Sequence, residues 1–122
     1  MRRITVPDPI TIANLNGDEM KLPDGAVARM NFEQFVFDRL SDPAWAKLGM
    51  KGILQVAEIR DKVRAAENGY LDLENSDWET LSQVTKDPSE GAQYDSRVAH
   101  NFLDFMRAIV EAPILKADQS EE

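Results

Sequence analysis

The sequence predicts an α+β fold, mainly α, in which four to five helices pack with a small N-terminal β-hairpin. Apolar and polar residues alternate over residues 1–25, and apolar residues recur at helical spacing from residue 31 onward. The chain has 122 residues, 43% hydrophobic and 30% charged, which is typical of one folded domain. We expect a single globular domain over 1–113, divided into a β-hairpin region (1–25) and a helical body (31–113), with a flexible acidic tail (114–122).

The hairpin region contains two strand patterns and a tight-turn dipeptide. Residues 4–6 and 10–12 each alternate apolar residues with threonine, and a Pro-Asp-Pro run separates them. Asn16-Gly17 tolerates the positive φ angles of tight hairpin turns, and the alternation resumes beyond it. We therefore predict a hairpin between roughly Ile10 and Leu22, ended by a turn at residues 23–25. Because an isolated hairpin is marginal in water, we expect it to lean on the helical body or on another chain.

Two helices are predicted between residues 31 and 49. Asn31 and Gln34 have capping-box spacing, and Phe37 lies off the apolar face that follows, so the pattern leaves its burial open. That face consists of Phe32, Phe35, Val36 and Leu40. Asp42-Pro43 predicts the start of a short helix, because Asp is a good N-cap and Pro is tolerated in the first turn. Its expected core residues are Trp45 and Leu48, and its expected end is Gly49.

A longer helix is predicted from about Lys51 to Asn68, where Asn68-Gly69 supplies a stop signal. Its expected inner stripe consists of Ile53, Val56, Ala57, Arg60, Val63 and Ala66. The alternation in Tyr70–Leu73 favours a short strand. Ser76 and Glu79 have capping-box spacing, which predicts a helix that ends near Asp87-Pro88. The inner face of that helix is expected to hold Trp78, Leu81 and Val84.

The last predicted helix has the clearest pattern. Its apolar residues recur at helical spacing and are Val98, Phe102, Phe105, Met106 and Ile109. A polar loop over residues 89–93 precedes it, Asp95 or Ser96 is the expected cap, and Pro113 is the expected stop.

The charge of the chain is strongly acidic and unevenly placed. The formal net charge is −8, from 22 acidic and 14 basic residues, and such a chain is repelled by phosphate backbones. Residues 67–95 hold eight acidic residues and one basic residue, whereas residues 43–66 hold five basic residues and two acidic ones. These segments either pair with each other as solvated faces or provide complementary patches for a partner or for self-association.

The candidate catalytic and metal-binding residues have simpler explanations. His100 lies one turn from Ser96 and from Asp104, but three residues stacked along one helix lack an oxyanion hole, and an exposed helix face explains the spacing. One histidine and no cysteine exclude the usual zinc sites. Asp72 opens a stretch like a calcium loop, yet Asp77 stands where that loop requires glycine. We expect neither an enzyme nor a bound cofactor or metal.

The absence of cysteine fits a reducing, cytoplasmic compartment, and no apolar run approaches the ~18 residues of a membrane span. We therefore predict a cytoplasmic protein that binds another protein, with no direct contact to nucleic acid or membrane, and a homo-oligomer remains an open alternative. Aromatic residues near an acidic segment are typical of protein-binding sites. The candidate partner-binding residues are Phe37, Tyr70, Asp72, Glu74, Asp77, Glu79 and Tyr94.

Five segments resemble small proteins encoded among the morphogenesis genes of tailed bacteriophages. They are MRRITVPDPITI, MNFEQFVFDRLSDPAW, ILQVAEIRDKV, YLDLENSDWETLSQVTKDPS and VAHNFLDFMRAIVEAP. The resemblance implies a helical assembly factor, similar to a tail assembly chaperone, that shields an aggregation-prone partner such as the tape measure protein in the host cytoplasm. It implies no catalytic residues. The acidic stretch 67–95 supports an alternative hypothesis, an inhibitor that imitates nucleic acid and blocks a host DNA-binding or defence protein.

Overall fold

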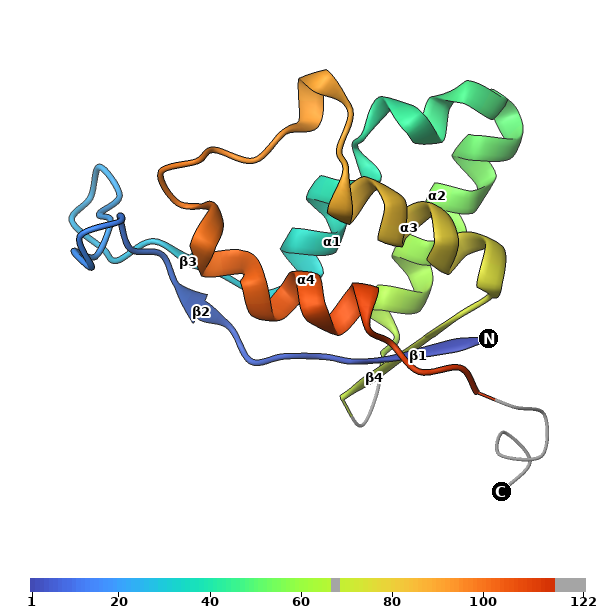
Figure 1. Cartoon of the computed structure of the whole chain (residues 1–122), viewed down its shortest axis with the longest axis horizontal. Helices are drawn as coiled ribbons and strands as arrows, with labels where there is room; N and C mark the ends of the chain where they lie inside the picture. The colour runs from blue at the N-terminus through green and yellow to red at the C-terminus, as the bar shows by residue number, and fades with distance from the viewer. Residues whose placement is uncertain (67–68, 116–122) are drawn as a thin grey trace.

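A helical body and a small β element make up the computed structural model, which describes residues 1–66 and 69–115 (Figure 1). The α+β, mainly α prediction is confirmed. In chain order the elements are β1 (Arg2–Thr5), β2 (Ile10–Thr11), β3 (Arg29–Met30), α1 (Phe32–Leu40), the 3₁₀ helix η1 (Pro43–Leu48), α2 (Met50–Arg64), β4 (Tyr70–Leu73), α3 (Asn75–Lys86), the 3₁₀ turns η2 (Glu90–Ala92) and η3 (Ala99–Phe102), and α4 (Leu103–Val110). Within the described residues, none of the helices combines the length and apolar character that a membrane crossing needs.

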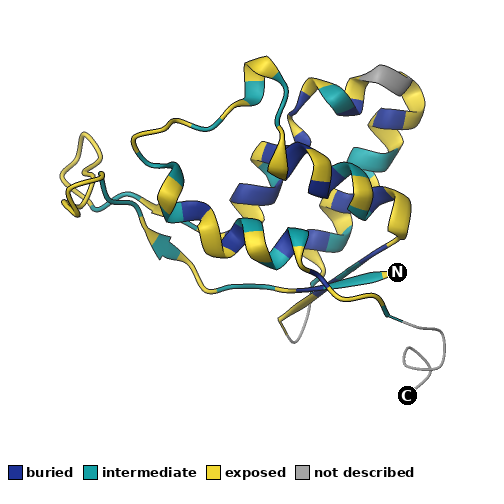
Figure 2. Ribbon diagram, in the orientation of Figure 1, coloured by how far each residue is buried: buried dark blue, intermediate teal, exposed yellow. Residues whose placement is uncertain are grey.

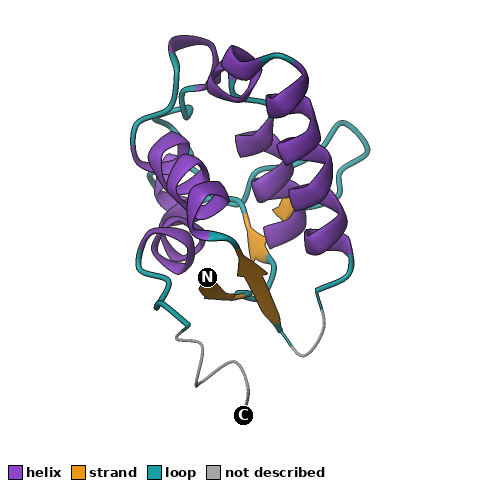
Figure 3. Ribbon diagram, turned by 90° about the vertical axis from the view of Figure 1, so that its right-hand side faces the viewer, coloured by secondary structure: helices purple, strands orange, loops and turns teal. Residues whose placement is uncertain are grey.

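Strands β1 and β4 form an antiparallel pair at the lower edge of the helices (Figures 1 and 3). Ile4 pairs with Leu71, and both are buried, so the alternating pattern of each strand sends one face into the core. The strand over Tyr70–Leu73 is therefore confirmed. The C-terminal segment joins the same edge, because Arg2 bridges Ile114 and the Leu115 N–H donates to the Met1 carbonyl at 2.7 Å. The first two residues of the expected tail are thus paired with the N-terminus, and residues 116–122 lie outside the described residues.

Residues 10–30, which we call the arm, differ from the predicted hairpin. Strand β2 pairs with β3, in the register Ile10 to Met30, and not mainly with residues 20–22. Two tight turns lie between these strands, at Gly17 and at Gly25, with φ angles of 90° and 88° that favour glycine. The predicted turn at Asn16-Gly17 forms, since Ala13 bridges Glu19 across it and the Met20 N–H donates to the Ile12 carbonyl at 2.9 Å. The prediction ended with this hairpin, whereas the second turn brings β3 back to β2. The expected support from the helical body is confirmed by the side chain of Asn101, which bonds the backbone of Ala13 at 3.1 and 2.7 Å.

Helices α1 and η1 follow the capping residues that the sequence indicates. The Asn31 side chain accepts the Gln34 N–H at 2.7 Å, and the expected inner residues of α1 are all buried. Gln34 donates its side-chain amide to Asp38, so only half of the capping box forms. The Asp42 side chain caps η1 by accepting the Ala44 N–H at 2.8 Å, and Gly49 ends η1 at a φ of 58°. Trp45 is buried as predicted, and the Leu48 side chain lies outside the described part of the structure.

The predicted inner stripe of α2 is confirmed in part. Val63 is buried and Val56, Ala57 and Ala66 are half-buried, but Ile53 is 68% exposed and Arg60 is exposed. Gly52 and Ile59, which the prediction left out, are buried. Gly52 packs directly on η1, where an added Cβ would overlap the carbonyl oxygen of Trp45. This close approach fixes the rotation of the helix. Helix α2 ends at Arg64, before the expected stop at Asn68, which lies outside the described residues.

Helices α3 and α4 close the core. Helix α3 begins at Asn75, with Ser76 inside its first turn, so the Ser76 capping box is wrong. Its expected inner residues Leu81 and Val84 are buried, and the half-buried Trp78 donates its indole N–H to the Ile109 carbonyl at 2.7 Å. The apolar pattern of the last helix is confirmed, although its first turn is the 3₁₀ turn η3. The buried faces of the helices meet in one core (Figure 2).

Candidate protein-binding groove

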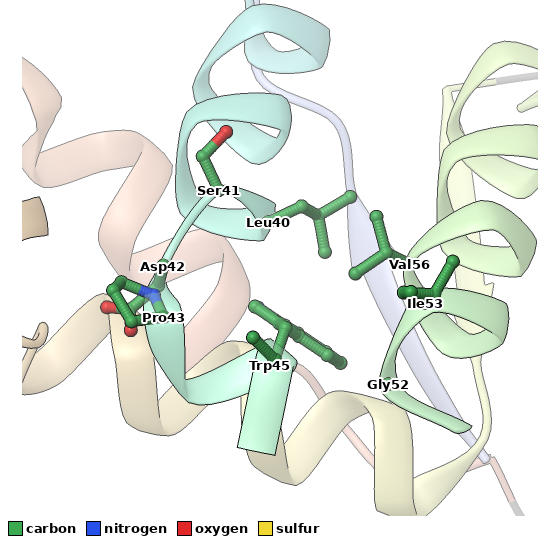
Figure 4. Close-up of a pocket in the computed structure, with 9 residues that line it drawn as sticks. Leu40, Ser41, Asp42, Pro43, Trp45, Gly52, Ile53 and Val56 are labelled. Atoms are coloured by element: carbon green, nitrogen blue, oxygen red, sulfur yellow. The ribbon is translucent and has the colours of Figure 1, made fainter. Parts of the chain in front are cut away.

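The end of α1, η1 and the first half of α2 enclose an apolar hollow of about 230 Å³ (Figure 4). A second hollow of about 190 Å³ continues along α1 and α2 and shares Leu40, Ser41 and Val56 with the first. We call the two together the α1–α2 groove. Its principal lining residues are Phe37, Leu40, Trp45, Gly52, Ile53, Val56, Arg60 and Arg64.

The wall that η1 provides is held in place by a buried carboxylate. Asp42 is 2% exposed and accepts three hydrogen bonds, from the Ala44 N–H, the Ser89 N–H at 2.9 Å and the Ser89 hydroxyl at 2.6 Å. Burial raises the pKa of Asp42, but the bonds from Ser89 and Ala44, together with the charge of Arg39, outweigh it and lower the pKa below its ordinary value. The carboxylate is therefore ionised at neutral pH and ties η1 to the loop after α3.

Large apolar side chains are exposed at the start of α2, and one of them, Ile53, lines the groove. Met50, Ile53 and Leu54 are 75%, 68% and 58% exposed, and they lie within the first two turns of α2. The wall beside them contains Trp45, whose indole N–H is buried with no hydrogen-bond partner among the described residues. An apolar cluster beside a hollow is typical of a surface that meets another protein.

The far end of the groove is basic. Arg60 and Arg64 line it, and the Arg64 guanidinium lies 5.6 Å from the centre of the Phe37 ring. Arg60 bonds the neighbouring Asp61, and because both side chains are exposed, that pair contributes little. The groove is long and shallow, with an apolar floor and a basic end, which suits a few side chains of another chain.

Of the seven candidate partner-binding residues, the structure brings only Phe37 into the groove, where it is half-buried. Tyr70 and Asp72 lie on β4 on either side of Arg3, which pairs with Asp72 at 2.8 Å and stacks over the Tyr70 ring at 4.9 Å. Tyr94 belongs to the core, because it stacks on Phe35 and donates its hydroxyl to the backbone of α3.

The three acidic candidates in and beside α3 differ in exposure. Glu74 and Glu79 are exposed, whereas Asp77 is 3% exposed and bonded by the Gln55 amide at 3.2 Å. Burial raises the pKa of Asp77, with Glu58 and Glu74 adding to the effect, and Lys62 and Gln55 oppose it.

Three of the described carboxylates in the acidic stretch 67–95 are buried or paired, and these interrupt the sequence of exposed ones at Glu74, Glu79, Asp87 and Glu90. Asp77 is buried, Asp72 pairs with Arg3, and Asp95 pairs with Arg97 at 2.8 Å, a bond that lowers the pKa of Asp95 to about 2. A nucleic-acid mimic needs neighbouring carboxylates that are exposed and unpaired. This placement therefore weighs against the nucleic-acid-mimic hypothesis.

The remaining chemical candidates stay dispersed. Ser96, His100 and Asp104 are all exposed; Ser96 precedes η3, His100 lies in it, and Asp104 lies in the first turn of α4. Across residues 1–66 and 69–115, no group of three or more His, Cys, Asp or Glu side chains is placed to hold a metal ion. A hollow of about 410 Å³ beside the N-terminus is lined by Arg3, Lys62 and Asp72, but Arg3 bonds Asp72 and Lys62 bonds Glu58 at 3.3 Å.

Comparisons with known proteins give no further guide: no protein family matches the chain, and neither the curated proteins nor the solved structures contain a significant match. The groove was not predicted from the sequence. The signal that points to it is the surplus of apolar residues at the start of α2, where Met50, Ile53 and Leu54 exceed what one inner face can bury.

Proposed function

We propose that this chain is a non-enzymatic protein-binding factor whose α1–α2 groove receives a segment of another polypeptide. The observation that carries the proposal is the exposure of Ile53, which lines an apolar hollow, together with that of Met50 and Leu54 on the same two turns of α2. Fully burying one such side chain contributes ~1.5–3 kcal/mol, so covering the exposed parts of these three offsets part of the cost of association.

The chemistry of the groove defines the segment that fits it. Its apolar floor requires apolar side chains, and the arginines at its far end favour acidic residues beside them. An acidic amphipathic helix, which lays one apolar face into a groove, combines these features.

The resemblance to phage morphogenesis proteins extends this proposal to an assembly factor. In that setting the groove would cover an apolar segment of a virion structural protein, in the way of a tail assembly chaperone, within the host cytoplasm. The support for this extension is the sequence resemblance alone, whereas the proposal of a protein-binding groove stands on the exposed residues of α2.

Two synthetic helical peptides test the groove. They share one apolar face and differ only in their flanking charges, which are glutamates in one and lysines in the other. Fluorescence anisotropy should show that the acidic peptide binds the chain and that the basic peptide binds at least about tenfold more weakly. Binding of the acidic peptide should be lost in Ile53→Glu, which places a carboxylate on the groove wall, and kept in Leu103→Glu.

Leu103→Glu is the matched control, because Leu103 is 47% exposed on α4 and lies outside the groove. Both variants should keep the far-ultraviolet circular dichroism of the wild type, since both side chains are exposed. Equal binding by wild type and Ile53→Glu, or equal binding of the two peptides, would contradict the proposal.

A further inference from the structure

The tip of the arm is the second exposed apolar feature of the molecule. Leu15, Met20 and Leu22 are 71%, 41% and 48% exposed. Leu15 lies in the first tight turn, and Leu22 bonds Ala26 across the second. The arm extends from the helical body, and its tip is exposed along its length (Figures 1 and 2). The helical body of the same chain therefore leaves these three side chains uncovered.

The charge of the arm tip is opposite to that of the groove end. Residues 14–26 contain three acidic residues, Asp18, Glu19 and Asp24, and one basic residue, Lys21. The far hollow of the α1–α2 groove is lined by Arg60 and Arg64 and by no acidic residue among those described. The tip thus carries both apolar and acidic side chains, and these complement the apolar floor and the basic end of the groove.

The arm lies at one end of the long axis of the molecule, and the groove lies away from it, with α1 near the middle and η1 and α2 toward the other end (Figure 1). One copy therefore cannot place its arm in its own groove. We propose that the arm of one copy docks in the α1–α2 groove of a second copy, so that the chain assembles head to tail. This inference rests on the proposed function, because it names the occupant of the same groove.

The arm is organised for such a contact before it binds. Three backbone bonds of 2.8–2.9 Å join Ile12, Met20 and Ala28, and Asn101 anchors the base of the arm at Ala13. A segment that is already ordered loses less conformational entropy on docking than a free loop does.

A head-to-tail contact can repeat. In a docked pair one copy keeps a free arm and the other keeps a free groove, so further copies can add until a ring closes or a filament forms. A two-fold contact through the arms alone would instead stop at a dimer.

Two variants, alone and mixed, test the head-to-tail contact by sedimentation velocity. The arm variant is Leu15→Glu/Leu22→Glu, and the groove variant is Ile53→Glu. The wild type should form species larger than a dimer as its concentration rises, and each variant alone should remain a monomer of 13.8 kDa. Because the arm variant keeps an intact groove and the groove variant an intact arm, their mixture should form a one-to-one dimer and nothing larger.

The control Leu103→Glu should assemble like the wild type, and added salt should weaken assembly because opposite charges meet in the contact. A wild type that stays monomeric at every concentration, a groove variant that still self-associates, or a mixture without a dimer would each overturn the inference. The peptide experiment separates the two proposals. If the acidic peptide binds the groove of a monomeric wild type, the proposed function survives and the head-to-tail contact does not.

Discussion

Replacing Asp42 with alanine should destabilise the protein by about 3 kcal/mol. The substitution removes the N-cap of η1, which typically costs ~1 kcal/mol. It also removes the charge-assisted bonds from Ser89, for which ~1.5–3 kcal/mol is typical. For a domain of this size, a loss of about 3 kcal/mol lowers the melting temperature by roughly 12 °C.

Urea unfolding followed by circular dichroism measures this loss. Asp38→Ala is the matched control, because Asp38 is an exposed carboxylate on α1 that accepts only the Gln34 amide, and it should unfold at nearly the wild-type urea concentration. Since η1 forms one wall of the groove, Asp42→Ala should also weaken binding of the acidic peptide. A loss of stability under about 1 kcal/mol would show that the carboxylate does not hold η1 in place.

The loss of stability caused by Asp42→Ala should depend on pH. The pKa of Asp42 is lowered in the folded state, so its contribution to stability is fully present above the unfolded pKa of about 3.9 and is lost as the pH falls through the folded value. The difference in unfolding free energy between wild type and Asp42→Ala should therefore be constant near neutral pH and shrink below about pH 4. A difference that stays constant into strong acid would refute the assignment.

Three further substitutions test other parts of the structure. Gly52→Ala should destabilise the protein by ~1–3 kcal/mol in the same urea assay, because the added Cβ would overlap the carbonyl oxygen of Trp45. This cost outweighs the better helix propensity of alanine. Gly91→Ala is the control and should be nearly neutral, because the space around Gly91 is open. Asp77→Asn should raise the unfolding free energy at neutral pH and lose that advantage below about pH 4, because burial raises the pKa of Asp77 and its charged form is disfavoured in the folded state. Asn101→Ala should speed hydrogen exchange at the Ala13 amide and lower the free energy of unfolding by about 1 kcal/mol. An unchanged exchange rate would show that Asn101 does not anchor the arm.

The features that the sequence predicts correctly are local ones. Asn31 and Asp42 cap helices because a short polar side chain reaches the N–H groups two or three residues ahead. The inner face of α1 and the pattern of α4 follow from helical spacing, which depends only on neighbouring residues. The Ser76 cap is wrong because the helix begins two residues earlier, with Glu74 at the N-cap position, and capping signals alone do not fix a boundary to within one or two residues.

The features that sequence reasoning missed depend on contacts between distant residues. Strand β1 and strand β4 were each visible as alternating patterns, but their pairing joins Ile4 to Leu71 across most of the helical body. The burial of Asp77 and Tyr94 likewise depends on elements that approach them from elsewhere in the chain. Four of the seven candidate partner-binding residues are carboxylates of the acidic stretch 67–95, and acidity in the sequence does not distinguish a free carboxylate from one that pairs with Arg3.

The rotation of α2 about its axis connects the fold with the proposed function. Successive residues of a helix lie about 100° apart, so turning α2 by one position would bury Ile53 and expose Ile59. Both faces carry enough apolar residues to serve as the inner one, and periodicity cannot choose between them. The choice comes from η1, which approaches so closely that only Gly52 fits against the Trp45 carbonyl. Once that contact is made, Met50, Ile53 and Leu54 face outward, and Ile53 lines the hollow that η1 borders. The contact that completes the core thereby creates a surface whose apolar side chains leave water only when another chain covers them.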